Sequence, residues 1–383
     1  MYGDETYPEI RAAVRQLCAG FPGRYWQALD RERAYPTEFV QALTEAGYLG
    51  CLIPEDYGGS GLPLSAAAAI LEEVHKAGCN GAACHAQMYT MGTVLRHGSE
   101  AQKARYLPEI AAGRLRLQAF GVTEPSSGTD TLSLRTTAER QGDRYIVNGQ
   151  KVWTSRAEHS DLLLLLARTT PRDQVAKKSE GLSVFLVDMR AVEGLSIRPI
   201  RTMMNHATTE LFFDGMEIPA DSLIGEEGKG FRYILDGMNA ERILIASECI
   251  GDARWFIAKA RDYAESRMVF GGPIGRNQGV QFPIARAFAD SEAAALMVAR
   301  AAALFDAGTP CGPEANMAKL LAAEAAWKAA DTCVQTHGGF GFAEEYDVER
   351  KFRETRLYQV APISTNLILS YLGEHVLGLP RSY

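Results

Sequence analysis

The chain has 383 residues, 46% hydrophobic and 23% charged, a balance typical of globular proteins that excludes disordered and fibrous classes. Lysines and arginines number 40 against 47 aspartates and glutamates, a formal net charge of −7, which argues against binding to a nucleic-acid backbone. No apolar run is long enough to span a membrane, the N-terminus carries no secretory or transit pattern, and seven cysteines favour reduced thiols. We therefore expect a cytoplasmic protein without a membrane span, folded into roughly two or three domains.

Residues 1–117 are predicted to form an N-terminal helical domain. Apolar residues recur there every three or four positions, in PTEFVQALTEAGYLG and in AAAAILEEVHKAG, which is the period of a helix with one buried face. Between these segments, PEDYGGSGLP has the glycines and prolines of a loop.

Residues 118–226 are predicted to form a middle β domain, because short strand-like runs replace the helical pattern. The runs LLLLLAR, LSVFLVDM and TTELFFDGMEIP read as strands. The segment RYIVNGQKVW reads as a hairpin with a type I′ turn at Asn148-Gly149.

Residues 227–383 are predicted to form a C-terminal bundle of four helices. The four amphipathic segments are ILIASECIGDARWFIAKARDYAESR, QFPIARAFADSEAAALMVARAAALF, GPEANMAKLLAAEAAWKAADTCVQ and STNLILSYLGEHVLG. The fold class is therefore mainly α, with a β domain between two helical domains.

Several common catalytic motifs are absent. The chain has no G-x-G-x-x-G after a strand, no phosphate-binding G-x-x-x-x-G-K-[ST], no G-x-S-x-G elbow and no H-E-x-x-H. His75, Cys79, Cys84 and His85 fall within eleven residues, but they lack a C-x-x-C type of spacing, and small cysteines are common in helical cores. We expect no metal site.

Four glycine-rich or aromatic segments are candidates for binding a ligand. AFGVTEPSSGTD and RMVFGGPIGRNQ offer backbone N–H groups and polar side chains, KVWTSR places a tryptophan at a strand end, and VQTHGGFGF allows close approach of a phosphate. Each also has a purely structural interpretation, as a polar loop, a core tryptophan or a glycine-terminated helix, and the residues alone leave both open.

Glu241 lies in GMNAERILIASECIG, a helical segment whose following turns are almost wholly apolar. A carboxylate on such a surface either forms an ion pair with an arginine, such as the adjacent Arg242, or has its pKa raised by desolvation. In the second case it suits a general base that works near neutral pH.

Taken together, the chain resembles the acyl-CoA dehydrogenase family over nearly its whole length. The motifs follow in order as AGYLGCLIPEDYGGSGL, SEAQKARYLPEIAAGRLRLQAFGVTEPSSGTD, YIVNGQKVWTS, LIGEEGKGF, FGGPIGRNQ, THGGFGF and RKFRETRLYQV. The resemblance implies an N-terminal helical domain, a central β-barrel and a C-terminal four-helix bundle. It also implies FAD as cofactor, a homotetramer, electron-transfer flavoprotein as electron acceptor, and a role in fatty acid metabolism.

The resemblance also assigns cofactor contacts position by position. The isoalloxazine and pyrophosphate would be lined by Phe120, Val122, Thr123, Gly128 and Thr129. Trp153 would flank the flavin ring, and Ser155 would stand near its N5 edge. Contacts to the FAD of a neighbouring subunit would come from Arg267, Phe270, Gln278, Gln335 and Gly339, and further FAD contacts from Ser364 and Asn366.

At the C-terminal active-site turn, this chain differs from the commonest sequence pattern of the family. Many family members read Y-E-G-T there and use the glutamate as base, whereas this chain reads YQVAPISTN, with Pro362 at that position. Members similar to isovaleryl-CoA and long-chain dehydrogenases carry the base on the bundle helix before an arginine, as Glu241-Arg242 does here. This implies that Glu241 removes the α-proton of an acyl-CoA thioester while flavin N5 accepts the β-hydride, giving a trans-2-enoyl-CoA.

In the same comparison, Arg242 and Pro362 fall at the substrate site. The family's backbone N–H at the turn position helps to bind the thioester carbonyl, and Pro362 has no N–H to donate.

Three functions other than that of a dehydrogenase therefore remain as alternatives. They are an enoyl-CoA reductase or acyl-CoA oxidase of the same fold, a weakened flavoprotein that binds CoA-bound or carrier-bound acyl groups, and a helical scaffold without cofactor.

Overall fold

The computed structural model describes residues 6–381 and divides the chain into two compact units. The first contains residues up to 32, residues 63–81 and residues from 239 onward, and the second contains residues 33–62 and 82–238. Both units are therefore discontinuous in sequence, and the helical segments before residue 118 contribute to each.

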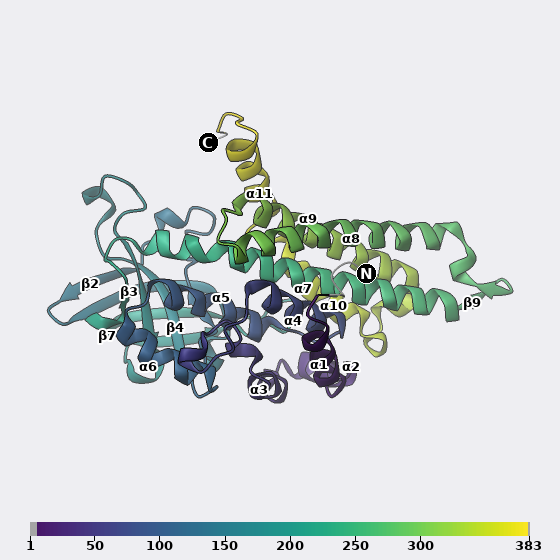
Figure 1. The fold of residues 1–383 in the computed structure, drawn as a ribbon, viewed down its shortest axis with the longest axis horizontal. Coiled ribbons are helices and arrows are strands. Elements are labelled where there is room, and N and C mark those ends of the chain that lie inside the picture. Colours follow the sequence, from purple (N-terminus) through teal and green to yellow (C-terminus); the bar gives the residue numbers. More distant parts are fainter. Residues whose placement is uncertain (1–5, 382–383) are drawn as a thin grey trace. The chain divides into compact units, whose positions relative to one another are not determined.

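The first unit is helical. Its helices are α1 (Pro8–Ala19), α2 (Gly23–Glu32), α4 (Leu64–Lys76), most of α7 (Gly230–Ser266), α8 (Gln278–Asp306), α9 (Gly312–His337), α10 (Val348–Thr355) and α11 (Thr365–Tyr371). The two short strands β9 (Met268–Val269) and β10 (Gly272–Pro273) form an antiparallel hairpin between α7 and α8 (Figure 1). All four predicted bundle segments are helical, and α10 is an additional helix that the sequence pattern did not reveal.

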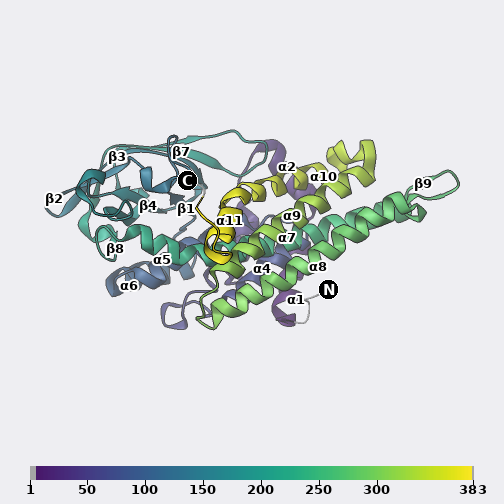
Figure 2. The ribbon, with the colours of Figure 1, turned by 90° about the horizontal axis from the view of Figure 1, so that it is seen from above.

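Small side chains bring α8 and α9 close together, and Figures 1 and 2 show the two helices side by side. On α8, alanine recurs every seven residues on the buried face, at Ala287, Ala294 and Ala301. On α9, buried alanines recur every three or four residues. A ridge of alanines lets neighbouring helix backbones approach, so the helical period of the sequence translates directly into packing.

A buried ionic cluster joins α4, α7 and α10. The Asp252 carboxylate accepts hydrogen bonds from Nδ1 of His75 and Oγ1 of Thr355, both at 2.8 Å, and forms an ion pair with Lys351. The backbone N–H of Gly81 donates to Nε2 of His75 at 3.0 Å, so the proton of this imidazole stays on Nδ1, facing Asp252. Within residues 6–381, no group of three or more His, Cys, Asp or Glu side chains is arranged to hold a metal ion.

The second unit combines helices with one sheet. Its helices are α3 (Thr37–Glu45), α5 (Ala82–His97) and α6 (Glu100–Ala111). Its strands are β1 (Ala119–Gly121), β2 (Thr137–Gln141), β3 (Arg144–Ser155), β4 (Leu162–Arg168), β5 (Leu182–Asp188), β6 (Leu195–Pro199), β7 (Thr208–Pro219) and β8 (Leu223–Ile224). The hydrogen-bonded order is β6-β7-β3-β2-β4-β5-β8, and β1 pairs with β4 in parallel.

Alternate residues of β4 enter two different cores. Leu162, Leu164 and Leu166 pack with residues of α5 and α6, whereas Leu163 and Leu165 pack with residues of β2, β3, β5 and β7. Both faces of β4 are covered, which explains why LLLLLAR is apolar throughout. Because strands from β7 to β5 share the second core, the sheet curves around it, although the described order stays open between β6 and β8.

The hairpin prediction at Asn148-Gly149 was wrong. The turn between β2 and β3 is Gly142-Asp143, since Gln141 pairs with Arg144 and Gly142 has a φ of +66°. Asn148 and Gly149 lie inside β3 at a shift of its register with β7. A Cβ on Gly149 would lie 2.7 Å from the Cα of Thr136, so this glycine serves a close backbone approach and not a turn.

No helix among residues 6–381 is both long enough and apolar enough to cross a membrane.

Candidate functional site

The predicted cofactor loop after β1 is anchored by a buried carboxylate. Glu124 accepts hydrogen bonds from the backbone N–H groups of Arg135 at 2.6 Å and Thr136 at 2.9 Å, and from Nζ of Lys151 at 2.9 Å. Nζ of Lys151 also donates to the Val122 carbonyl, 3.0 Å away. The Glu124–Lys151 pair therefore fixes the loop on both sides, since Val122 precedes it and Arg135 and Thr136 follow it.

Burial and charge oppose each other in this ion pair. Burial raises the pKa of Glu124, but the Lys151 ammonium and the two backbone N–H groups outweigh it and hold that pKa below its ordinary value. Burial lowers the pKa of Lys151 to about 8, against the attraction of Glu124. Such a pair keeps its charges only while its hydrogen bonds are complete, so the loop conformation and the ion pair depend on each other.

Between its anchors the loop exposes its backbone. Glu124 and Ser127 exchange two backbone hydrogen bonds, of 3.1 and 3.0 Å, which close a tight turn. The next two residues, Gly128 and Thr129, are exposed, and a Cβ on Gly128 would meet no atom within 4 Å. The other loop residues predicted to contact the cofactor are half-buried: Phe120, Val122 and Thr123.

Trp153 stands out in the second unit because its backbone and its exposure are both unusual. It lies where the register between β3 and β7 shifts, with a φ of +62°, and its side chain is 59% exposed. A bulky residue in the left-handed region is rare and marks a strained position, often at a functional site. The N–H of Val152 donates to the Thr123 carbonyl at 2.9 Å, so the structure brings Trp153 beside the loop, with Ser155 half-buried two residues on.

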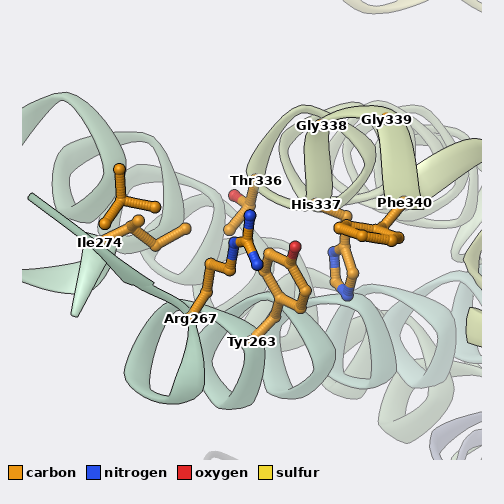
Figure 3. A pocket seen from close by; sticks show the side chains of 9 residues that line it. Tyr263, Arg267, Ile274, Thr336, His337, Gly338, Gly339 and Phe340 are labelled. Carbon is orange, nitrogen blue, oxygen red and sulfur yellow. The ribbon is translucent and has the colours of Figure 1, made fainter.

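A second candidate site is a cavity of about 450 Å³ in the first unit. Figure 3 shows the ring of Tyr263, from α7, and the guanidinium of Arg267, the residue directly after α7, facing the end of α9. The Arg267 guanidinium lies 5.6 Å from the centre of the Phe340 ring, and Tyr263 stacks on His337 at 4.2 Å. The lining residues are Tyr263, Arg267, Val269, Ile274, Thr336, His337, Gly338, Gly339 and Phe340.

The end of α9 gives this cavity an accessible backbone. Gly338 has φ +58° and ψ −134°, a conformation that essentially only glycine adopts, and a Cβ on either Gly338 or Gly339 would meet no atom within 4 Å. Burial lowers the pKa of His337, whose Nδ1 bonds to the Cys333 carbonyl at 2.8 Å. The cavity thus combines one guanidinium, an aromatic wall and an open glycine backbone, a set that suits an anionic, planar ligand.

Three other residues predicted to contact FAD are close in sequence to residues of this cavity but do not line it. Phe270 is at the tip of the β9–β10 hairpin, with a φ of +51° and 97% of its side chain exposed. Gln278 is the first residue of α8, and Gln335 is exposed near the end of α9. Of the five residues predicted to contact FAD from a neighbouring subunit, the structure brings Arg267 and Gly339 together.

Glu241 and Arg242 lie on α7, in the part of that helix that belongs to the first unit. Both side chains are partly exposed, and Nη1 of Arg242 donates to Oδ1 of Asn239 at 3.1 Å. Burial lowers the pKa of Arg242, while Glu241 and Tyr371 act in the opposite direction. The helix holds the carboxylate next to a guanidinium that is itself fixed.

The C-terminal turn lies between the short helical turn Arg356–Gln359 and α11. Pro362 is exposed in this turn. The Oγ of Ser364 accepts a hydrogen bond from the N–H of Leu367 at 3.3 Å, so this side chain caps α11, and Asn366 is exposed in the first turn of that helix.

Sequence reasoning missed the buried lysines Lys151 and Lys319 and the cavity residues Tyr263 and His337. Lys151 is the lone charge in YIVNGQKVW, and Lys319 lies in the mostly apolar MAKLLAAEAAW with Glu324 as the other charge. A charge in such a pattern is a visible signal of a specific buried partner. His337 lies within the candidate segment VQTHGGFGF, but no signal in the sequence predicts its stacking on Tyr263, because this contact joins two helices far apart in sequence.

Comparison with known proteins gives a consistent result over the whole chain. Three domain families match it in order: acyl-CoA dehydrogenase N-terminal domain over residues 4–114, middle domain over residues 119–216, and C-terminal domain over residues 228–375. The chain is similar to acyl-CoA dehydrogenase FadE12 of Mycobacterium tuberculosis, with 34% identity over 99% of this chain and 98% of that relative.

The chain is also similar to two proteins whose names give different activities, a reductase and a dehydrogenase. The chain is 32% identical to 3-(aryl)acrylate reductase of Clostridium sporogenes, over 94% of this chain and 95% of the relative. Its fold is similar to the solved structure of glutaryl-CoA dehydrogenase in complex with glutaryl-CoA, with a TM-score of 0.92 and 30% identity, covering 100% of this chain and 98% of that one. These comparisons bear out the predicted order of helical, β and helical domains.

Proposed function

Because the chain belongs to the acyl-CoA dehydrogenase family, we propose that it is an FAD-dependent enzyme that converts an acyl-CoA thioester to a trans-2-enoyl-CoA, with Glu241 as the base. One observation carries the choice of base. The C-terminal turn, where many members hold a glutamate, has Pro362, whereas α7 offers Glu241 directly before Arg242.

The chemistry explains why a fixed carboxylate is needed. The α-proton of a thioester is weakly acidic, so a base must stand at one face of the acyl chain while the β-hydrogen leaves from the other. Glu241 takes this proton at a carboxylate oxygen, and its position on a long helix limits its movement. Arg242, anchored on Asn239, is proposed to keep the surroundings of the carboxylate in place.

The residues of both candidate sites fit FAD. Arg267 presents a guanidinium to a cavity with the open backbone of Gly338 and Gly339, a combination that suits a pyrophosphate. The exposed Trp153 ring and the open loop at Gly128 suit a planar ring and its phosphates. Bound FAD supplies the acceptor for the β-hydride. The remaining proposed contacts come from Phe120, Val122, Thr123, Thr129, Ser155, Phe270, Gln278, Gln335, Ser364 and Asn366.

We propose a homotetramer that passes electrons to electron-transfer flavoprotein, in the cytoplasm and in fatty acid metabolism. Exposed apolar side chains on the long helices support self-association, among them Phe282, Phe288 and Leu296 on α8 and Leu321 on α9. All seven cysteines lie within the described residues, are buried and form no disulfide, which suits a reducing compartment.

The proposal is tested by anaerobic titration of the FAD-loaded protein with straight and branched acyl-CoA thioesters, followed by the visible flavin absorbance. We expect one acyl type to bleach the flavin and to yield the matching enoyl-CoA. If no saturated thioester bleaches it, but enoyl-CoA reoxidises the reduced protein, the enzyme is a reductase, as its similarity to 3-(aryl)acrylate reductase allows. Rapid reoxidation by oxygen identifies an oxidase. Binding without any redox change identifies the weakened flavoprotein that the missing N–H of Pro362 permits.

Replacing Lys151 with methionine is expected to weaken FAD binding at least tenfold. The change leaves the buried Glu124 carboxylate without its ammonium, a loss that typically destabilises by about 3–5 kcal/mol, and frees the loop on the side of Val122. FAD affinity is measured by reconstituting the apoprotein and following flavin fluorescence. Lys328→Met, which removes an exposed lysine paired with Asp290, serves as the control and should bind FAD like the wild type. Equal FAD affinity in the Lys151 variant would show that the pair does not support the cofactor loop.

A further inference from the structure

Lys319 of α9 is a fully buried lysine that holds the C-terminal turn at both ends. Its side chain is 0% exposed. Nζ donates to the carbonyl of Tyr358 at 2.6 Å and to the carbonyl of Ile363 at 2.8 Å. These two carbonyls bracket residues 359–362, so one ammonium closes the turn that contains Pro362.

The partners of Lys319 are unusual for a buried charge. Among the described residues no carboxylate lies within ion-pair distance of its Nζ, and burial lowers its pKa, an effect to which the nearby Arg242 adds. A buried ammonium without a counter-ion is expensive, and it is held here by charge-assisted hydrogen bonds to two carbonyl oxygens. The side chain also brings the turn to the same region of the first unit as Arg242, the neighbour of Glu241.

The other hydrogen bonds described for the turn involve groups other than the carbonyls of Tyr358 and Ile363, which accept from Lys319. The N–H groups of Val360 and Ala361 both donate to the Leu357 carbonyl at 3.0 Å, which closes the first half of the turn internally. Nε2 of Gln359 donates to the Ala323 carbonyl at 2.8 Å, which ties the first half to α9. After Pro362, the described hydrogen bond from Lys319 to Ile363 is the link between the turn and α9.

We infer that Lys319 is a positioning residue for the acyl thioester: by holding the carbonyls of Tyr358 and Ile363, it sets the shape of the turn against which the thioester binds. This inference rests on the proposed function, since the turn meets substrate only if the chain is an acyl-CoA dehydrogenase. A lysine suits the task because its flexible four-carbon stem reaches the turn from the middle of α9 and its ammonium donates in several directions.

The test compares Lys319→Met, which removes the donors, with Lys319→Gln, which keeps two N–H donors without charge. Hydrogen exchange, read by mass spectrometry on the FAD-loaded protein, follows the amides of Val360 and Ala361. Anaerobic titration follows the dissociation constant of the acyl-CoA that reduces the wild type. We expect Lys319→Met to speed exchange in the turn at least tenfold and to weaken thioester binding at least tenfold, with Lys319→Gln between it and the wild type. If the methionine variant fails to fold, the glutamine variant carries the comparison.

Lys351→Met is the matched control, because Lys351 is also fully buried in the first unit but pairs with Asp252. It should lower thermal stability while leaving thioester affinity within about twofold of the wild type. A Lys319 variant that loses stability but keeps both the exchange pattern of the turn and thioester affinity would overturn the inference and assign Lys319 a structural role only. A wild type that binds no acyl-CoA would instead overturn the proposed function, and this inference with it.

Discussion

Replacing Glu241 with glutamine should slow reduction of the flavin by acyl-CoA by about 100- to 10,000-fold, the range over which a positioned general base accelerates proton transfer. Glutamine keeps the size and most hydrogen-bonding capacity of the side chain but cannot accept a proton from the α-carbon. The rate is measured by anaerobic stopped-flow absorbance at saturating thioester. FAD content and thioester affinity should change little, because the substitution removes a proton acceptor and not a binding contact.

Glu248→Gln provides the matched control on the same helix. Glu248 lies seven residues further along α7, is buried, and accepts a hydrogen bond from the hydroxyl of Tyr358 at 3.2 Å, which a glutamine oxygen can also accept. This variant should reduce its flavin at a rate within about threefold of the wild type. If the Glu241 variant reduces its flavin normally and the Glu248 variant does not, then Glu248, and not Glu241, is the base.

The Asp252→Asn variant is expected to lose about 3–5 kcal/mol of stability at neutral pH, the usual effect of removing one partner from a buried ionic cluster. The substitution leaves the buried Lys351 ammonium without the carboxylate that it contacts in α7. It also puts an amide where His75 and Thr355 now donate to carboxylate oxygens. Thermal unfolding of the FAD-loaded protein, at matched protein concentration, measures the effect. Asp290→Asn, at an exposed pair with Lys328, should change stability by less than about 1 kcal/mol.

The pH dependence of this effect has a definite sign. Burial raises the pKa of Asp252, but Lys351 and His75 outweigh it and bring the value to about 2, against about 3.9 for an aspartate in an unfolded chain. The folded state therefore binds this proton less tightly than the unfolded state. The corresponding stabilisation, about 2–3 kcal/mol, is complete above about pH 4 and is lost as the pH falls towards 2. The difference between wild type and Asp252→Asn should narrow over that interval, and a constant difference would show that the carboxylate charge is not what stabilises the cluster.

The sequence predicted features that depend on short-range pattern. The helical period identified α7, α8 and α9, and the apolar run of β4 identified a strand, which the structure shows to be buried on both faces. The Asn148-Gly149 turn was mispredicted because a favourable dipeptide for a turn can equally serve a close approach between strands, and only the pairing of β3 with β7 decides between these uses.

The candidate sites were also predictable only in part, because contacts between residues far apart in sequence decide their surroundings. The sequence motifs singled out Trp153 and Arg267 as candidates, but did not reveal the side chains that hold the surroundings of the candidate sites. Lys151 meets Glu124 across 27 residues of sequence, and Lys319 meets Ile363 across 44. Such partners are chosen by tertiary structure, and a single sequence carries no record of the distance in space between them.

The discontinuous first unit has a consequence for the order in which the protein folds during synthesis. On α2, Asp30 forms an ion pair at 2.6 Å with Arg353, and 323 residues separate the two. Residues 33–62 and 82–238 are complete before most of the first unit has left the ribosome, so the second unit is able to fold while α2 still lacks its partners. Only Trp26 of the ten residues of α2 is buried in the finished fold. That largely polar surface suits a segment that must stay soluble until the last part of the chain arrives.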